Sequence, residues 1–266
     1  MPTVRLPFAL FTLVLFFYSC TKNEVAQQAS NQRLHKIIYR DGDSSGYRTF
    51  KYDVDGKLSV IEDSNAQTHM GRTFVYYNER NKINKLLRKW YYGSLNNLNS
   101  QWTDSFVYDN NDRIIGTIQV SPQSTIPNSK IDKTFSYDEL GRLTADTGHR
   151  TAPGISNLTR FTYDGSDDVV QIEEIKYVGA GANNIIKMKY NLKENPHKQL
   201  GTASYFLDWD PSLTLSKHAP LEVIYRDHSR YLSYEYYNNG LTRKISYTST
   251  GLYASPTPET TEFFYE

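Results

Sequence analysis

The sequence predicts an all-β protein built as a large single-sheet antiparallel meander of hairpin repeats, curved or barrel-like, with about 14–16 strands. Three observations predict this fold. Tyrosine is over-represented, with 22 residues in a chain of 266. A short motif of aromatic residues followed by a turn recurs along most of the chain, and stretches with helical periodicity are nearly absent. Aromatic and β-branched residues suit the pleated, half-buried surface of a sheet.

The chain opens with an apolar segment that ends at its only cysteine. Residues 6–18 are apolar apart from Thr12, are interrupted by Pro7 and follow the positively charged Arg5. This run is shorter than the roughly 20 residues that a membrane-crossing helix needs, and it has the form of a secretory signal. We therefore predict a lipoprotein signal peptide at residues 1–19.

Cys20 stands directly after this signal core. A lone cysteine at that place resembles a bacterial lipobox, in which the thiol is acylated and becomes the mature N-terminus. The alternative is an ordinary signal peptide with an incidental cysteine. A polar segment without strand or helix pattern follows, so residues 20–33 are predicted to be the lipidated cysteine and a flexible tether to a membrane. A single cysteine excludes an internal disulfide and a cysteine-based zinc site.

Charge excludes one class of partner. Arg5 is the only charged residue before Cys20, so the rest of the chain carries 29 Lys and Arg against 29 Asp and Glu. A nucleic-acid-binding domain would show an excess of positive charge gathered in a stripe or patch. We expect no nucleic acid as a partner, and the oligomeric state stays open.

The repeated unit is most complete in "FSYDELGRL", residues 135–143. Its aromatic residues stand at alternate positions, so both point to one face of a strand. Asp138 suits the first position of a type I turn, and Gly141 falls at the fourth, where a positive φ closes a hairpin with a bulge. Glycine adopts this conformation most easily, followed by Asn and Asp. The predicted turn residues are Asp53, Gly56, Asp138, Gly141 and Gly240, with Asn81, Asp112 and Asp167 at the fourth position of other copies.

The copies recur at a nearly constant interval. Their tyrosines lie 25, 31, 29, 26, 27, 46 and 29 residues apart, and only the sixth interval is anomalous. A repeat of this length indicates that neighbouring units stack and bury a shared face. Each unit is interpreted as two antiparallel strands, and residues 34–266 as one repeat domain. The aligned tyrosines are Tyr52, Tyr77, Tyr108, Tyr137, Tyr163, Tyr190, Tyr236 and Tyr265.

The unit resembles the YD repeat of Rhs, teneurin and insecticidal-toxin shell proteins. The match is complete at Tyr137-Asp138 and at Gly141-Arg142-Leu143. In those families, long arrays of the repeat wrap a hollow shell around a C-terminal payload. Here the last copy stands at residues 263–266, so the resemblance implies the repeat architecture without a toxin-delivery role.

The later part of the chain resembles a family of lipid-anchored exported proteins from Bacteroidota. The matching residues are Asn195-Pro196, Ser216-Lys217 with Pro220, and the stretch from Tyr234 to Lys244. The fold described for that family is porin-like, and no function is assigned to it. The resemblance therefore implies a large antiparallel meander and no particular activity.

Two interruptions of the repeat are candidate binding sites. Trp90, Tyr91 and Tyr92 are expected to face Trp102 across an Asn-rich hairpin tip, where exposed rings would stack on sugars or anchor a protein partner. Buried rings would instead form the core end of a longer hairpin, and this interpretation is favoured.

The second interruption lies in the anomalous interval. Asp208, Trp209 and Asp210 suggest a carbohydrate-binding or acid/base site in which two carboxylates flank an indole ring. The favoured interpretation is an irregular insertion that packs over the end of the sheet, since one aromatic residue with two acids is common in loops.

No catalytic or cofactor motif is present. The six histidines show no metal-ligand spacing, and the phosphate-binding and nucleophile-elbow motifs are absent. We therefore expect no catalytic residue, no metal and no cofactor. The leading hypothesis is a non-enzymatic, lipid-anchored binding module of the outer membrane, facing the periplasm or the cell surface, with a glycan or protein ligand. The alternatives are a glycan hydrolase that uses carboxylates of residues 206–220, and an integral outer-membrane barrel.

Overall fold

The structure is a computed structural model, and it describes residues 32–41, 44–65, 69–121, 130–150, 156–176, 183–200, 205, 214–251 and 259–266. The predicted signal peptide, Cys20 and most of the predicted tether lie outside the described residues. So do Asp208, Trp209 and Asp210.

The described residues form sixteen β-strands and one short 3-10 helix. No helix among them is long and apolar enough to cross a membrane. The strands are β1 (Leu34–Asp41), β2 (Ser44–Tyr52), β3 (Leu58–Asn65), β4 (His69–Tyr77), β5 (Ile83–Tyr92), β6 (Leu98–Tyr108), β7 (Ile114–Val120), β8 (Lys130–Tyr137), β9 (Leu143–Arg150), β10 (Ser156–Tyr163), β11 (Val169–Lys176), β12 (Asn184–Glu194), β13 (His218–Ile224), β14 (Ser229–Tyr236), β15 (Thr242–Ser249) and β16 (Glu259–Tyr265), and the helix is η1 (Pro196–Leu200).

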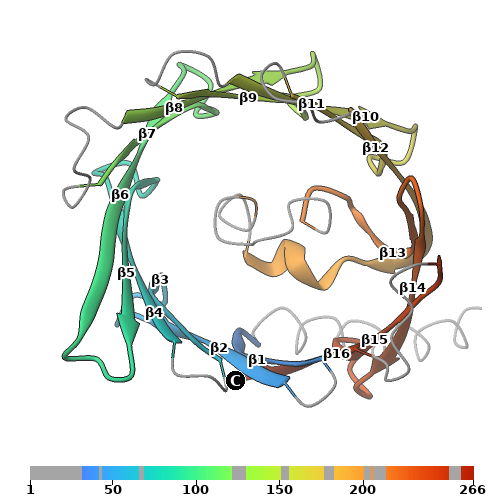
Figure 1. Cartoon of the computed structure of the whole chain (residues 1–266), viewed down its shortest axis with the longest axis horizontal. Helices are drawn as coiled ribbons and strands as arrows, with labels where there is room; N and C mark the ends of the chain where they lie inside the picture. Colours follow the sequence, from blue (N-terminus) through green and yellow to red (C-terminus); the bar gives the residue numbers. More distant parts are fainter. Residues whose placement is uncertain are drawn as a thin grey trace, which may run out of the picture.

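The strands form one closed antiparallel barrel (Figure 1). Each strand pairs with its neighbours in the sequence, which confirms the predicted meander and strand number. The sequence left open whether the sheet closes. Closure comes from pairing of β1 with β16, where Ile37 lies opposite Phe263. Backbone hydrogen bonds of 2.8 and 2.9 Å between Arg33 and Glu266 tie the two ends of the described chain together.

The turns of the repeat have the geometry that the sequence predicts. In the unit at residues 135–143, the Gly141 N–H donates to the Asp138 carbonyl at 3.0 Å. The Asp138 carboxylate accepts from the backbone N–H groups of Leu140 and Arg142 at 3.0 and 2.8 Å. The hydrogen bond from the backbone N–H of Arg142 lowers the pKa of the Asp138 carboxyl, and the hydrogen bond from the Arg142 guanidinium lowers it further. The fourth turn position has positive φ in six units, at Gly56, Asn81, Asp112, Gly141, Asp167 and Gly240.

The repeat tyrosines link each unit to the one before it. Tyr137, the last residue of β8, donates its hydroxyl to the carbonyl of Ile114, the first residue of β7, at 2.6 Å. Seven of the eight aligned tyrosines make this bond. Each donor lies on an even-numbered strand, and each acceptor is the first residue of the strand before it. The donor and acceptor pairs are Tyr52 to Leu34, Tyr77 to Leu58, Tyr108 to Ile83, Tyr137 to Ile114, Tyr163 to Leu143, Tyr190 to Val169, and Tyr265 to Thr242.

The aromatic face of the sheet points into the barrel. Figure 1 shows η1, which follows β12, lying within the ring of strands. We call the described residues between β12 and β13, which are 195–200, 205 and 214–217, the internal segment. Tyr205 of this segment packs edge-on against Phe135 and Phe161, with ring centroids 6.2 and 6.1 Å apart. His197 of η1 packs in the same way against Phe263 at 5.8 Å. The internal segment therefore covers part of the apolar face that the repeats share.

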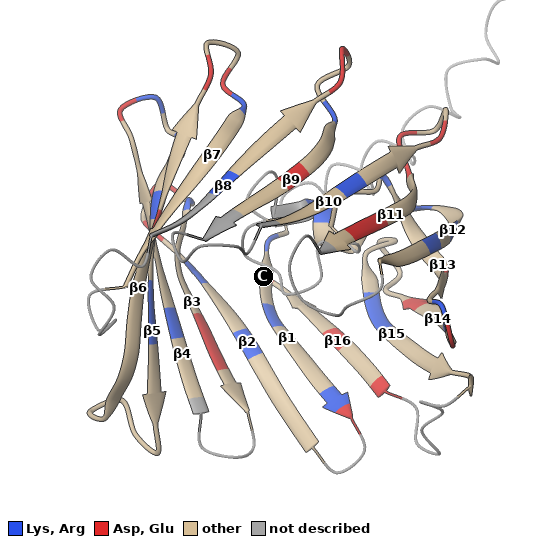
Figure 2. Ribbon diagram, turned by 45° about the horizontal axis from the view of Figure 1, so that its top comes forward, with Lys and Arg blue, Asp and Glu red and all other residues tan. Residues whose placement is uncertain are grey.

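Charged residues are distributed along the strands of the barrel (Figure 2). Because Phe50 and Met188 are buried inside, the neighbouring Lys51 and Lys189 point outward. Lys51 and Arg72 pair across strands with Glu62 at 2.7 and 2.8 Å. Such pairs recur on the far side of the barrel, between Arg160 and Glu173 and between Lys189 and Glu222.

Candidate ligand-binding site

Polar side chains share the inward face with the aromatic residues. Arg48 lies on the same face of β2 as Phe50 and Tyr52, and it is 3% exposed. Its Nε donates to Asp63 at 2.6 Å. The sequence predicted that the aromatic residues of a repeat share one face of a strand, and farther from the turn the same face also carries this ion pair. Further pairs on inward positions are Arg88 with Asp104, Lys133 with Asp146, Asn184 with Glu174, and Arg230 with Glu259.

Two of these ion pairs border a cavity of about 490 Å³. It lies at the end of the barrel where β1 passes into β2, opposite the end that carries the repeat turns. Its volume is within the usual range for small-ligand sites. Aromatic rings alternate with ion pairs and hydroxyl groups in its wall. The lining includes Tyr39, Arg48, Asp63, Asn65, Trp90, His197, Arg230, Tyr247, Glu259 and Thr261.

Trp90 is placed in this wall by a glycine on the next strand. Gly71 of β4 lies opposite Trp90 in the register of β4 and β5. A Cβ at Gly71 would stand 3.2 Å from the benzo ring of Trp90, which is tighter than most packed contacts. Trp90 also stacks with Trp102 of β6, at a centroid distance of 6.4 Å and an interplanar angle of 17°. The indole is therefore held between neighbouring strands.

The structure brings together only part of the predicted aromatic cluster. Trp90 and Trp102 form a stacked pair, and Trp90 faces the cavity. Tyr91 is buried and Tyr92 is 55% exposed, and neither lines this cavity. Sequence reasoning missed the ion pairs of the wall. The sequence does contain a signal for the position of Arg48. Arg48 lies four residues before Tyr52 on the same strand, so alternation places both side chains on one face.

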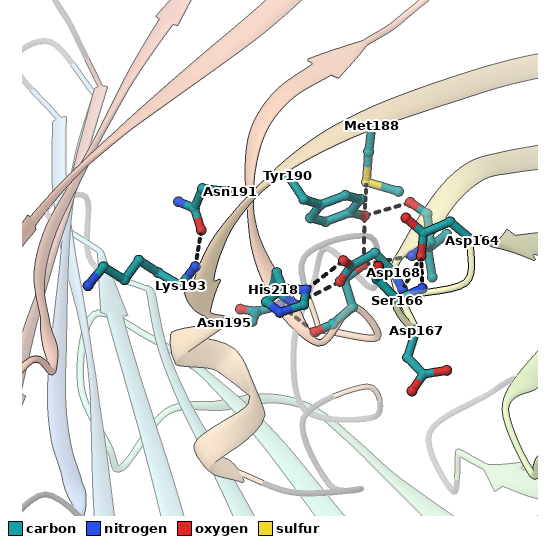
Figure 3. A network of polar contacts seen from close by, with 12 residues as sticks. Asp164, Ser166, Asp167, Asp168, Met188, Tyr190, Asn191, Lys193, Asn195 and His218 are labelled. Carbon is teal, nitrogen blue, oxygen red and sulfur yellow. Dashed lines mark hydrogen bonds and ion pairs between the residues drawn. The ribbon is translucent and has the colours of Figure 1, made fainter. Parts of the chain in front are cut away.

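A second polar network lies where the internal segment rejoins the sheet (Figure 3). The Asp168 carboxylate accepts from the backbone N–H of His218 and contacts its Nδ1, both at 2.7 Å. The Ser216 hydroxyl accepts from the N–H of Val169 at 3.1 Å and donates to the Tyr190 hydroxyl at 2.6 Å. Tyr190 donates in turn to the Val169 carbonyl.

This network positions the internal segment and does not have the order of a catalytic triad. In a triad the serine hydroxyl bonds to the histidine, whereas Ser216 bonds to Tyr190. Ser216 is fully buried, and Asp168 is 2% exposed. Asp168 also occupies the turn position that Arg142 holds in the complete repeat. Its carboxylate therefore holds the returning chain at the start of β13.

Metal-binding side chains do not gather in the described part of the chain. No group of three or more His, Cys, Asp and Glu residues there is placed to hold a metal ion. The wall of the cavity beside Trp90 carries aromatic rings, ion pairs and hydroxyl groups.

These features define the class of the protein as a closed sixteen-stranded antiparallel barrel with an internal segment. The chain is similar in fold to the solved structure of a porin-like protein from Bacteroides uniformis. It aligns with a TM-score of 0.56 at 10% identity, over 88% of this chain and 96% of that one.

Two further solved structures are similar at lower scores. A porin-like protein from Bacteroides vulgatus gives a TM-score of 0.41 at 9% identity, over 89% of this chain and 99% of that one. The Photorhabdus luminescens Tc holotoxin pore gives 0.23 at 12% identity, over 81% of this chain and 15% of that one. No protein-family model and no curated protein sequence matches the chain.

Proposed function

We propose that this chain is an exported, lipid-anchored binding protein of the bacterial cell envelope, without enzymatic activity, whose barrel binds a carbohydrate in its interior cavity. The cavity of about 490 Å³ beside Trp90 is the observation on which the proposal depends. The signal-like N-terminus and Cys20 support export and anchoring at the outer membrane.

The wall chemistry favours a carbohydrate as the ligand. A sugar ring presents an apolar C–H face and a rim of hydroxyl groups. Tyr39, Trp90 and Tyr247 offer aromatic surfaces, on which such a face stacks. The carboxylate of Asp63 and the guanidinium of Arg48 add acceptors and donors for the hydroxyl groups. Because the wall residues lie on inward positions at the end of a barrel, a small sugar fits the site better than a protein surface.

The charged residues on the outer wall favour a barrel that does not pass through a lipid bilayer. A membrane barrel presents an apolar band to the lipid, and a charged residue in the middle of that band is costly. Here Lys51, Glu62 and Arg72 occupy outward positions on three successive strands. Arg160 and Glu173 do so on another side. We therefore expect the chain from Asn31 onward to stay dissolved without detergent. A requirement for detergent would favour the integral barrel.

Sugar binding can be tested at Trp90. The purified protein is titrated with a panel of mono- and oligosaccharides by calorimetry. Replacement Trp90→Ala is expected to weaken binding at least about tenfold, equivalent to about 1.4 kcal/mol, because the stacking surface is lost. Tyr76→Ala is the matched control, since Tyr76 is 40% exposed and is not part of the cavity wall.

Three results would overturn the proposal. The first is that no sugar in the panel binds, and the second is unchanged affinity in the Trp90→Ala protein. The third is cleavage of a sugar that Asp208→Asn or Asp210→Asn abolishes, which would favour the glycan hydrolase.

The anchor has a separate test. Cys20→Ala removes the acylated thiol and is expected to move the protein from the membrane fraction to the soluble fraction of lysed cells. Unchanged fractionation would contradict lipidation. Protease treatment of intact cells then distinguishes the periplasm from the cell surface.

A further inference from the structure

A second cavity, of about 560 Å³, lies at the opposite end of the barrel. It is bordered by the end of β12, by η1 and by the turn between β14 and β15. Three lysines line it: Lys193 from β12, Lys198 from η1, and Lys217 from the chain that leads into β13. They are brought together because the internal segment leaves and rejoins the sheet at this place.

The positive charge of these lysines is incompletely balanced. All three are exposed, and none forms an ion pair within the part of the chain that the structure describes. Among the described residues that line the cavity, Glu194 is the only acidic one, so these residues carry a net charge of two positive units. The Lys193 Nζ lies 5.6 Å from the ring centroid of Tyr236, another lining residue. Figure 3 shows this side chain pointing away from the Asp168–His218 pair.

Like charges gathered around one cavity repel each other, and a bound anion relieves that repulsion. The lysine ammonium group is a common partner of phosphate, which it contacts as a point charge. Asn239 also borders the cavity and could donate a neutral hydrogen bond. We propose that this cavity binds a phosphate group. The inference is independent of the sugar site, because it uses different residues at the other end of the barrel.

The position of the cavity relates it to the N-terminal segment. Asn239 donates to the side chain of Gln32, the first residue that the structure describes, at 2.7 Å. The predicted tether therefore joins the barrel beside this cavity. With the chain anchored through Cys20, the phosphate of a lipid headgroup would be the nearest source of the anion. A soluble phosphate compound is the other source, and it has the same binding chemistry.

The experiment compares two probes on the full chain carrying Cys20→Ala, which is not lipidated. Inorganic phosphate is titrated by calorimetry, and phosphatidylcholine vesicles with or without phosphatidylglycerol are tested by co-sedimentation. Replacement of Lys193, Lys198 and Lys217 by Gln is expected to weaken binding at least about tenfold, since hydrogen bonds to charged groups are the stronger kind. The control replaces Lys51, Lys85 and Lys244 on the outer wall by Gln and removes the same charge.

The outcomes separate the two sources of phosphate. Vesicle binding that needs phosphatidylglycerol and is lost in the cavity variant indicates a lipid headgroup. Binding of inorganic phosphate without vesicle binding indicates a soluble compound. The proposal is overturned when neither probe binds, or when the control variant loses as much affinity as the cavity variant. Equal thermal midpoints of the two variants show that both are folded.

Discussion

The tyrosine of the repeat has two physical roles. Its ring contributes to the apolar face inside the barrel, and its hydroxyl bonds to a carbonyl of the preceding unit. That carbonyl belongs to the first residue after a turn. Phenylalanine would fill the same volume and leave the carbonyl without this donor. The preference for tyrosine at this position is therefore explained by the link between units.

At the scale of single residues, this role predicts the effect of removing one hydroxyl. Tyr137→Phe is expected to lower the free energy of unfolding by about 1 kcal/mol, the usual net value of one hydrogen bond. Urea unfolding followed by circular dichroism measures the change. Tyr47→Phe is the control, because Tyr47 is 43% exposed and its hydroxyl makes no hydrogen bond among the described residues. Equal losses in the two variants would contradict the role given to the tyrosine hydroxyl.

At the scale of elements, the hairpin turn is the most regular part of the protein. The same backbone hydrogen bonds form at Asp53, Asn78, Asp109 and Asp138, although the residues between them differ. The turn tolerates this variation because only its first and fourth residues have a specific task. In the fifth unit, Asp168 follows the turn and instead holds the internal segment through His218.

The turn geometry makes one glycine more sensitive than another. At Gly141, φ is +79° and an added Cβ would meet no atom within 4 Å. Gly141→Ala is therefore expected to cost about 1–2 kcal/mol through backbone strain alone. Gly165 has equally open space without a positive φ, so Gly165→Ala should change stability by less than about 0.5 kcal/mol. Thermal or urea unfolding compares them, and a similar effect of both changes would show that φ is not the cause.

At the scale of the whole molecule, closure of the barrel creates an interior with two kinds of lining. Near the turns the interior is aromatic and is partly covered by the internal segment. Toward the other end it carries buried ion pairs such as Arg48 with Asp63. Removing one partner of a buried pair leaves the other charge without compensation. The buried interior is therefore mainly aromatic near the repeat turns and polar toward the other end.

The buried tyrosines predict how the whole barrel responds to alkali. Burial raises the pKa of Tyr52 and Tyr137 to about 12, and it raises the pKa of Tyr163, Tyr190 and Tyr265 as well. Their ordinary pKa is near 10, so up to about that pH both the folded and the unfolded state keep the proton. Between about pH 10 and 12 the unfolded chain ionises first, and stability falls as pH rises.

This alkaline loss is measured by melting the protein at increasing pH while tyrosinate absorbance is recorded. The midpoint should fall steeply above about pH 10, together with a cooperative increase in tyrosinate. Tyr137→Phe should make the fall less steep. A midpoint that stays constant while the tyrosines ionise would contradict their burial in the folded state.

Local patterns determined much of the fold. Alternation placed Phe135 and Tyr137 on one face, and the requirement for positive φ selected Gly, Asn or Asp at the fourth turn position. The spacing of the copies predicted the number of strands. The candidate site was less accessible from the sequence. Trp90 and Trp102 were predicted together, but the ion pairs Arg48–Asp63 and Arg230–Glu259 were not.

The sequence by itself determined the antiparallel meander, its turns and its inner face, because alternation and turn geometry depend on neighbours within a few residues. Only the tertiary structure decided that β1 pairs with β16 and that η1 lies inside the ring. Only closure brings Arg230 and Glu259 to the same cavity as Tyr39 and Trp90. Such contacts join residues far apart in the chain, and they depend on the curvature of the whole sheet, to which every strand contributes.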